Sequence, residues 1–232
     1  MLYRYESLTS TIDTAKELAL AHPLPLAVIA RRQTAGRGRL GRPFSSEAGG
    51  LYFSYAFRPT CSLGQVPSLS LLGALALADA LESLGCPRPD IKWPNDLLFR
   101  GKKICGILTE AADADGLFLV MGIGVNLTNP IPAELPQAGN LQDLLGSAPS
   151  PETLAEALEQ ALADTLRQPF EAALARYRSQ CITLGRAVTV TTHDGILRGT
   201  AVDIGPTGAL MVKTASGQTT AVQSGDATLS PR

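Results

Sequence analysis

The sequence is poor in metal-binding residues and carries no large excess of charge. Its 232 residues include four cysteines and two histidines, and no Cys-x-x-Cys pair occurs. A structural zinc site needs four closely spaced ligands of this kind, so none is expected, and we assign no metal ligand to the protein. The formal net charge of −1 argues against the strongly basic surface that binds long nucleic acids.

Signatures of several other protein classes are also missing. No apolar run is long enough to span a bilayer, and the first residues lack the hydrophobic core of a signal peptide. The phosphate-binding pattern Gly-x-x-x-x-Gly-Lys-Ser/Thr is absent, and no Ser-His-Asp arrangement is evident. The scattered cysteines fit reduced thiols. We therefore predict a cytoplasmic protein with no membrane partner.

Positive charge is instead concentrated in one stretch, Gly36-Arg37-Gly38-Arg39-Leu40-Gly41-Arg42. Three guanidinium groups alternate with three glycines, and only one apolar side chain is available for burial. Glycine lets the backbone turn freely and approach a ligand closely, while arginine carries a fork of donors suited to carboxylate and phosphate. The pattern favours a loop that captures a small anionic ligand over a merely solvated basic loop.

Hydrophobic periodicity predicts the elements that surround this loop. Helices are expected over 10–21, with a capping box from Ser10 to Asp13, from Ser68 to about Leu84, and over 152–180 with a break at Pro169. Strands are expected over 26–30, 51–57, up to 93, in a hairpin of 97–99 with 103–109, and over 116–126. The glycines of that last strand would let a ligand approach the backbone closely. Residues 129–151 read as an irregular loop.

The texture of the sequence changes after Leu184. Short β-prone runs occupy 187–192, 196–204, 209–214 and 219–223, separated by turn signals such as Gly205-Pro206-Thr207-Gly208. Strands at this spacing predict a small β-barrel. We expect an α+β fold with two domains, a catalytic domain over 1–184 with a mixed sheet and helices, and a barrel over 185–232.

Five cationic residues lie on connections or strand ends of the first domain: Arg37, Arg39, Arg42, Lys92 and Lys103. If they converge, they form a pocket that offsets the repulsion between two anions that must react. Activation of a carboxylate by ATP is such a reaction, and its rate depends on positioning and on stabilised charge at phosphorus. A glycine-rich loop closing over an acyl-adenylate would also exclude water. These features do not name the acid.

Four motifs, in order, resemble those of biotin protein ligases. They are Gly36 to Arg42, Lys92-Trp93-Pro94-Asn95-Asp96, Lys103-Ile104-Cys105-Gly106-Ile107-Leu108-Thr109-Glu110, and Gly122-Ile123-Gly124-Val125-Asn126. The resemblance implies a class II synthetase-like catalytic domain followed by an SH3-like barrel. It implies that biotin and MgATP give biotinyl-5′-AMP, and that biotin then passes to a lysine of the biotin carboxyl carrier protein of acetyl-CoA carboxylase.

The resemblance also implies a role for individual residues. The residues matched to biotin binding are Ser10, Thr11, Ile12, Gln33, Arg37, Gly38, Arg39 and Lys103. Those matched to ATP binding are Arg37, Arg39, Arg42, Lys92, Asn95 and Asn126. The catalytic set is Lys103, Arg37, Arg39 and Asp96, with Asp96 expected to help deprotonate the incoming lysine, whose reference pKa is about 10.4.

The sequence departs from the family pattern at Ile12, where the family often has asparagine, and at Phe44, where tryptophan is common. Ser10 comes too early to leave room for the helix-turn-helix domain of some bacterial members, so no DNA partner is expected. A homodimer through a sheet edge is compatible with the family. Two alternatives stay open: a lipoate or octanoate ligase or transferase of the same superfamily, and a non-catalytic or inactive biotin-binding module.

Overall fold

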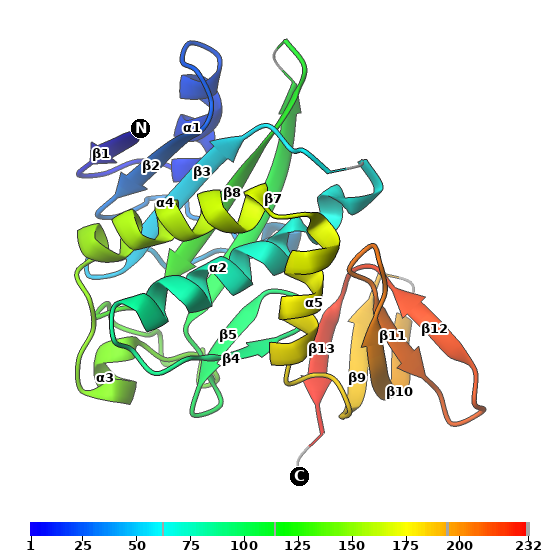
Figure 1. The fold of residues 1–232 in the computed structure, drawn as a ribbon. Coiled ribbons are helices and arrows are strands. Elements are labelled where there is room, and N and C mark those ends of the chain that lie inside the picture. The colour runs from blue at the N-terminus through cyan, green and yellow to red at the C-terminus, as the bar shows by residue number, and fades with distance from the viewer. Residues whose placement is uncertain (62, 114, 194, 231–232) are drawn as a thin grey trace.

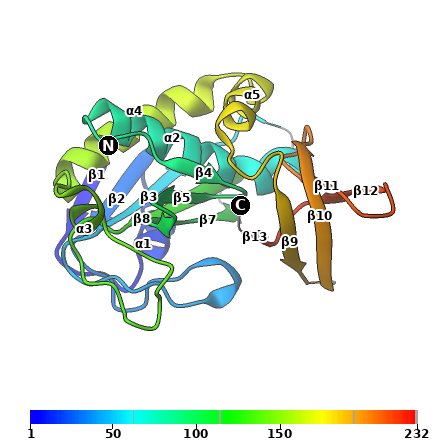
Figure 2. The ribbon, with the colours of Figure 1, turned by 90° about the horizontal axis from the view of Figure 1, so that it is seen from below.

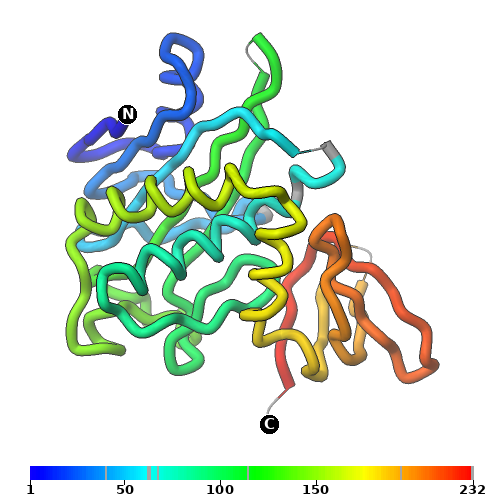
Figure 3. The backbone as a smooth tube through the Cα atoms, in the orientation of Figure 1, coloured from blue at the N-terminus to red at the C-terminus, as the bar shows by residue number. Residues whose placement is uncertain are grey.

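The computed structural model describes residues 1–61, 63–113, 115–193 and 195–230. Figure 1 shows a larger α/β part and a smaller, orange-to-red C-terminal sheet beside α5 (Phe170–Gln180). The tube in Figure 3 shows that the chain passes from one part to the other once. Among the described helices, none has both the length and the apolar character needed to cross a bilayer.

The larger part is built on a five-stranded mixed sheet in the order β1-β2-β3-β8-β7. Its strands are β1 (Leu2–Tyr5), β2 (Leu26–Ala30), β3 (Leu51–Phe57), β7 (Cys105–Asp113) and β8 (Leu117–Val125). β1 pairs with β2 in parallel, and the other pairs are antiparallel. The mixed sheet expected from the sequence is therefore present, with β1 as an additional edge strand.

Alternation along β3 sends its side chains to two apolar layers. Phe53, Tyr55 and Phe57 pack in the main core, against α2 (Leu69–Ser83) and α4 (Pro151–Arg167). Ala56 faces the other side, in a second cluster with Ile12 of α1 (Thr11–Ala19). Figure 2 shows α1 on one face of the sheet and α2 with α4 on the opposite face.

A short three-stranded sheet flanks the core, formed by β4 (Asp90–Lys92), β5 (Asp96–Phe99) and β6 (Lys102–Lys103). The hairpin expected for 97–99 with 103–109 is correct in its first pairing, Leu98 with Lys103. The second strand then breaks at Ile104, and β7 joins the large sheet. Lys103 consequently lies where two sheets meet. The stretch expected to be irregular contains a short helix, α3 (Leu141–Leu145), capped by Asn140.

The smaller part is a five-stranded antiparallel sheet in the order β12-β11-β10-β9-β13. Its strands are β9 (Ala187–Thr192), β10 (Gly195–Ile204), β11 (Leu210–Lys213), β12 (Thr219–Val222) and β13 (Asp226–Leu229). The periodicity predicts the first four but not β13. Val188, Ile204 and Leu210 belong to the same buried cluster as α2, so the apolar core is continuous across the predicted boundary at residue 184. That boundary stays a prediction.

Side chains at the contact between the two parts are hydrogen-bonded. The indole N–H of Trp93, which is fully buried, donates to the Gly208 carbonyl at 3.0 Å. Ser68 ends the 3₁₀ helix η2 (Leu63–Ser68), and its hydroxyl donates to the Thr207 carbonyl. Ser68 occupies the N-cap position of α2, but its side chain makes no capping bond and contacts the C-terminal sheet instead.

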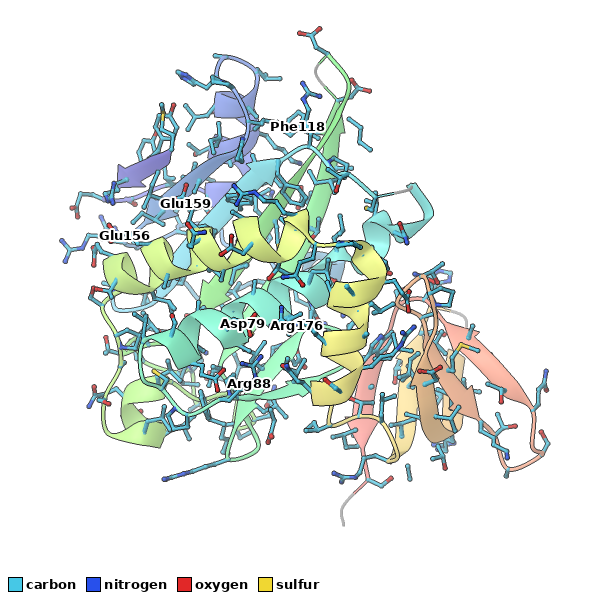
Figure 4. All side chains as sticks on the ribbon, in the orientation of Figure 1. Asp79, Arg88, Phe118, Glu156, Glu159 and Arg176 are labelled. Atoms are coloured by element: carbon cyan, nitrogen blue, oxygen red, sulfur yellow. The ribbon has the colours of Figure 1, made fainter. Side chains whose placement is uncertain are left out.

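Ion pairs tie the outer helices together away from this contact. Asp79 of α2 accepts from Arg88 at 2.7 Å and from Arg176 of α5 at 2.8 Å, and Figure 4 shows the three side chains converging. Glu156 of α4 accepts from Arg4 of β1 at 3.1 Å. The pairs of Asp79 join α2 to α5, and the exposed pair of Glu156 joins α4 to the edge strand of the sheet.

Candidate active site

One cavity of about 450 Å³ brings together the residues that the sequence predicts for the site. It lies between the large sheet, the start of α1, the β4–β6 sheet, the arginine loop and β13. The predicted residues that line it are Ser10, Thr11, Ile12, Gln33, Arg37, Gly38, Arg39, Arg42, Lys92, Asn95, Asp96, Lys103 and Asn126. Their convergence was expected, while their individual roles stay predictions.

The arginine loop is a closed hairpin over residues 36–44. The Phe44 amide donates to the Gly36 carbonyl at 2.9 Å, and the Gly38 amide donates to the Arg42 carbonyl at 2.8 Å. A 3₁₀ turn, η1 (Arg39–Gly41), forms its tip, with Gly41 at φ +70°. Backbone hydrogen bonds therefore give this loop a defined shape with Arg39 at its end.

The base of the loop sits on two paired glycines, Gly106 of β7 and Gly124 of β8. A Cβ atom at either glycine would lie closer than 3.0 Å to the Phe44 ring. Ile12 occupies the corresponding space above Gly122. The strand glycines do allow close approach, as expected, but in this structure two side chains of the chain itself use it.

Polar groups gather at the start of α1. Gln33 Oε1 accepts from the Thr11 amide at 2.8 Å and from the Thr11 hydroxyl at 3.1 Å, and Gln33 Nε2 donates to Ser46 Oγ at 2.9 Å. The Ser54 hydroxyl donates to Thr11 Oγ1 at 2.8 Å. Gln33 thus accepts from one of the first amides of the helix, which have no hydrogen-bond partner within the helix itself.

The predicted capping box is wrong. Ser10 occupies the N-cap position, but its hydroxyl makes no capping hydrogen bond, and Asp13 pairs with Arg37 instead. Ser10 is 2 % exposed and lines the cavity. Its hydroxyl has no partner within the described chain, so it can donate to or accept from a ligand.

Ile12 is an apolar wall residue. It is 4 % exposed and belongs to a buried cluster with Ala15, Leu26 and Val28. The side chain of Ile12 consequently offers a ligand no hydrogen bond, and side-chain polar contacts at this end must come from its neighbours and from Gln33.

Two lysines share one carboxylate at the opposite end. Asp96 lies 2.5 Å from the Lys103 ammonium and 3.0 Å from that of Lys92. Burial alone would raise the pKa of Asp96, but the charges of Lys103 and Lys92 outweigh it, and the pKa is lowered. Asp96 is therefore a carboxylate at neutral pH, and the three groups together carry one net positive charge.

The three arginines have different partners. Arg37 makes two hydrogen bonds to Asp13, at 2.8 and 2.6 Å, and Arg42 pairs with Asp226 of β13 at 2.9 Å. Arg39 donates only to neutral groups, Asn95 Oδ1 and the Gly225 carbonyl, both at 3.3 Å. Among the described residues, no carboxylate pairs with Arg39. The tip of the loop thus adds a second positive charge that no protein anion offsets.

The sequence does not predict two further parts of the wall. One is Asp226, Ala227 and Thr228 of β13, and the other is an apolar turn lined by Ile131, Pro132 and Leu135. Asn126 helps to hold this turn, since its side-chain amide donates to the Gly139 carbonyl at 3.2 Å. The repeated prolines and apolar residues of 129–136 were the available signal for an ordered wall.

Comparison with known proteins adds independent information. Residues 3–126 match the model of the Biotin/lipoate A/B protein ligase family, and residues 183–230 match the Biotin protein ligase C terminal domain. The chain is 34% identical to the bifunctional ligase/repressor BirA of Bacillus subtilis, over 93% of this chain and 70% of that protein. It is 35% identical to the biotin–[acetyl-CoA-carboxylase] ligase of Mycobacterium tuberculosis, over 87% and 77% respectively.

Its fold is similar to that of the biotin protein ligase of Aquifex aeolicus, solved in complex with biotin and ATP. The TM-score is 0.85 at 28% identity, and the match covers 100% of this chain and 99% of that chain. The likeness therefore extends through both parts of the molecule, including the sheet that carries β13.

Proposed function

The chain belongs to the biotin protein ligases of the Biotin/lipoate A/B protein ligase family, and on that premise we propose that it joins biotin to a carrier protein. In this proposal it is a biotin–[biotin carboxyl carrier protein] ligase with MgATP as co-substrate. Mg²⁺ enters with the nucleotide, as part of a substrate, and no protein ligand is assigned to it.

The two ends of the cavity differ as this substrate requires. The polar end at Ser10, Thr11 and Gln33 suits the ureido group of biotin, which both donates and accepts hydrogen bonds. The apolar wall formed by Ile12 and Phe44 suits its rings and aliphatic chain. The biotin carboxylate then extends toward Lys103 and the tip of the loop, where positive charge is in excess.

In the first step, a carboxylate oxygen of biotin attacks the α-phosphorus of ATP, and the bond from phosphorus to the pyrophosphate oxygen breaks. Both reactants are anions, so the step needs fixed positive charge around the new bond. Lys103 and Arg39 supply it, since Lys103 shares its counterion with Lys92, and the partners of Arg39 among the described residues are all neutral. The hairpin over the cavity would keep water away from the biotinyl-5′-AMP product.

In the second step, the neutral amine of a carrier lysine attacks the acyl carbon, and the bond from that carbon to the AMP oxygen breaks. The amine must first lose a proton. The lowered pKa of Asp96 makes it a weak base, so its contacts with Lys92 and Lys103 support an orienting role more strongly than proton abstraction.

The observation that carries the proposal is the excess of two positive charges at one end of a cavity whose other end is polar and neutral. The test is pyrophosphate release from MgATP with biotin, lipoate or octanoate supplied in turn. Release with biotin supports the proposal. Release with lipoate or octanoate alone would make the chain a lipoate or octanoate ligase. No pyrophosphate release with any of the three acids would favour a binding module.

Lys103→Ala should reduce biotin-dependent pyrophosphate release at least about 100-fold, the effect of removing one transition-state charge contact, while the protein stays folded. Lys102→Ala is the matched control, because that neighbouring lysine donates to the Pro136 carbonyl and does not line the cavity. Full activity of Lys103→Ala would remove Lys103 from the mechanism.

A further inference from the structure

Arg37 is held by charged residues that lie outside the arginine loop. Besides its two hydrogen bonds to Asp13, its guanidinium lies 3.8 Å from one carboxylate oxygen of Glu110. The other oxygen of Glu110 accepts from Lys16 at 2.6 Å. We call these four residues, Asp13, Lys16, Arg37 and Glu110, the anchor cluster. It contains two cations and two carboxylates and is neutral overall.

The anchor cluster connects three elements around the cavity. Asp13 and Lys16 lie on α1, whose start forms the polar end, and Glu110 lies on β7, which carries the glycine beneath Phe44. Arg37 begins the first arm of the loop. The anchor cluster thus joins the first arm of the loop both to α1 and to β7.

The three arginines of the loop differ in how easily a ligand anion could displace their present partners. A ligand anion could bind Arg37 fully only by displacing a carboxylate that already makes two hydrogen bonds, which is a strong geometry for arginine. Arg42, on the second arm, also has a carboxylate partner. At Arg39 a ligand would displace only an amide oxygen and a carbonyl. Both arms are therefore fixed by protein anions, and the tip is left for the ligand.

We propose that Asp13 and Glu110 are positioning residues for the adenylation reaction, which fix the loop through Arg37 so that Arg39 meets the reacting carboxylate and phosphate. This inference rests on the proposed function. In this proposal the arginines have different roles: Arg37 anchors the loop, and Arg39 contacts the ligand. Loss of Asp13 should then free the loop without removing any group that touches the substrate.

The first test compares Asp13→Asn with wild type for retention of biotinyl-5′-AMP, measured as the rate of its release after gel filtration. Release should be about two- to five-fold faster, the effect size of a partly exposed ion pair, and the initial rate of pyrophosphate formation at saturating biotin should fall by a similar factor, because Arg39 is then held less firmly at the reacting groups. Release from wild type should accelerate with salt, and release from the variant should respond less, because salt screens the pair.

Two further variants serve as controls. Glu6→Gln makes the same kind of change at an exposed pair with Arg31, 3.6 Å apart, and should behave as wild type. Asp13→Glu should restore retention, since it keeps the carboxylate. Equal release by Asp13→Asn and Glu6→Gln would overturn the proposal.

The second test needs no enzymatic activity. Trypsin should cleave the ligand-free loop after Arg37 or Arg39 faster in Asp13→Asn than in wild type or Glu6→Gln, and this would support the anchor even if biotin were not the acid. A lowered Tm with unchanged loop cleavage and unchanged retention would make Asp13 a stabiliser of α1 only, and would overturn the proposal.

Discussion

At the scale of single residues, the charge of the site depends on one carboxylate that is shared by two lysines. Asp96 has a side chain only 14% exposed and is contacted by two ammonium groups. The carboxylate lies on β5, between β4 and β6, which carry the two lysines. Asp96 thus holds Lys103 in position and partly neutralises the positive charge that Lys103 brings to the proposed reaction.

Removing that carboxylate should be costly at neutral pH. Asp96→Asn leaves two lysines without their anion, and we expect a loss of about 1–3 kcal/mol in the free energy of unfolding. Because the folded pKa of Asp96 lies below its unfolded value of about 3.9, the stabilisation is complete above that value and is lost as pH falls through the folded pKa. The measurement is urea unfolding at pH 7 and at several pH values below 4. The difference in free energy of unfolding between wild type and Asp96→Asn should become smaller as the pH falls.

The exposed Asp90 of β4 provides the control for this experiment. Asp90→Asn should unfold like wild type throughout. A difference for Asp96→Asn that grew on acidification would contradict the assigned direction of the pKa change.

Removing the neighbouring hydroxyls of Ser10 and Thr11 should have different effects, the first on biotin binding and the second on thermal stability. Ser10→Ala removes a hydroxyl with no partner in the described chain, so Tm should stay the same while KM for biotin rises about 2- to 10-fold, the value of one hydrogen bond. Thr11→Ala removes hydrogen bonds to Gln33 and Ser54 and should lower Tm. Steady-state kinetics and calorimetry on both variants would check this, and a lowered Tm for Ser10→Ala alone would refute it.

At the scale of elements, the loop and the strand pair beneath it form one unit. The extended pairing of β7 with β8 places Gly106 opposite Gly124, and the Phe44 ring fills the space that two side chains would otherwise take. The ring also lies edge-on to Tyr52, with centroids 6.4 Å apart. The hairpin is thereby packed onto the sheet at its base.

Gly124→Ala should disrupt this unit, because the added Cβ would overlap the Phe44 ring. We expect a loss of about 1–3 kcal/mol, typical of overpacking, together with faster tryptic cleavage of the loop. Gly64→Ala is the control, since a Cβ added there would meet no described atom within 4 Å beyond its chain neighbours. The double variant Gly124→Ala/Phe44→Leu should recover part of the loss, and strict additivity would contradict the contact.

Periodicity was sufficient to predict the elements whose own residues determine them. The alternation of 51–57 and the buried pattern of 68–84 predict β3 and α2 almost to the residue. β1, β13 and α3 were missed because each has only four or five residues and is stabilised by a neighbour rather than by its own pattern. The site residues were predicted from family motifs, whereas the ion pairs of Asp13 and Asp226 were not, because their partners are distant in sequence.

At the scale of the whole molecule, the two parts share a core and a cavity wall. The described core runs from α2 through Ile91 and Trp93 to Val188 and Leu210 without interruption. Trp93 is the only tryptophan of the chain, and it lies fully buried where the two parts meet. Its fluorescence consequently reports on this contact.

We expect the two parts to unfold together. In urea, the red shift of Trp93 fluorescence should coincide with the loss of helical circular dichroism, as in a two-state transition. Trp93→Phe is the control that shows the signal belongs to the contact. A fluorescence change that precedes the loss of helix would mean that the C-terminal sheet detaches first.

The position of β13 has a consequence for how the protein is made. It is the last of the described strands to be synthesised, yet Asp226 binds Arg42 and Gly225 accepts from Arg39. A nascent chain could fold its large sheet while the loop still lacked these partners. Catalytic competence would then arrive only at the end of translation, because a chain cut short before residue 226 would lack both the carboxylate that binds Arg42 and the buried Ala227 of the shared core.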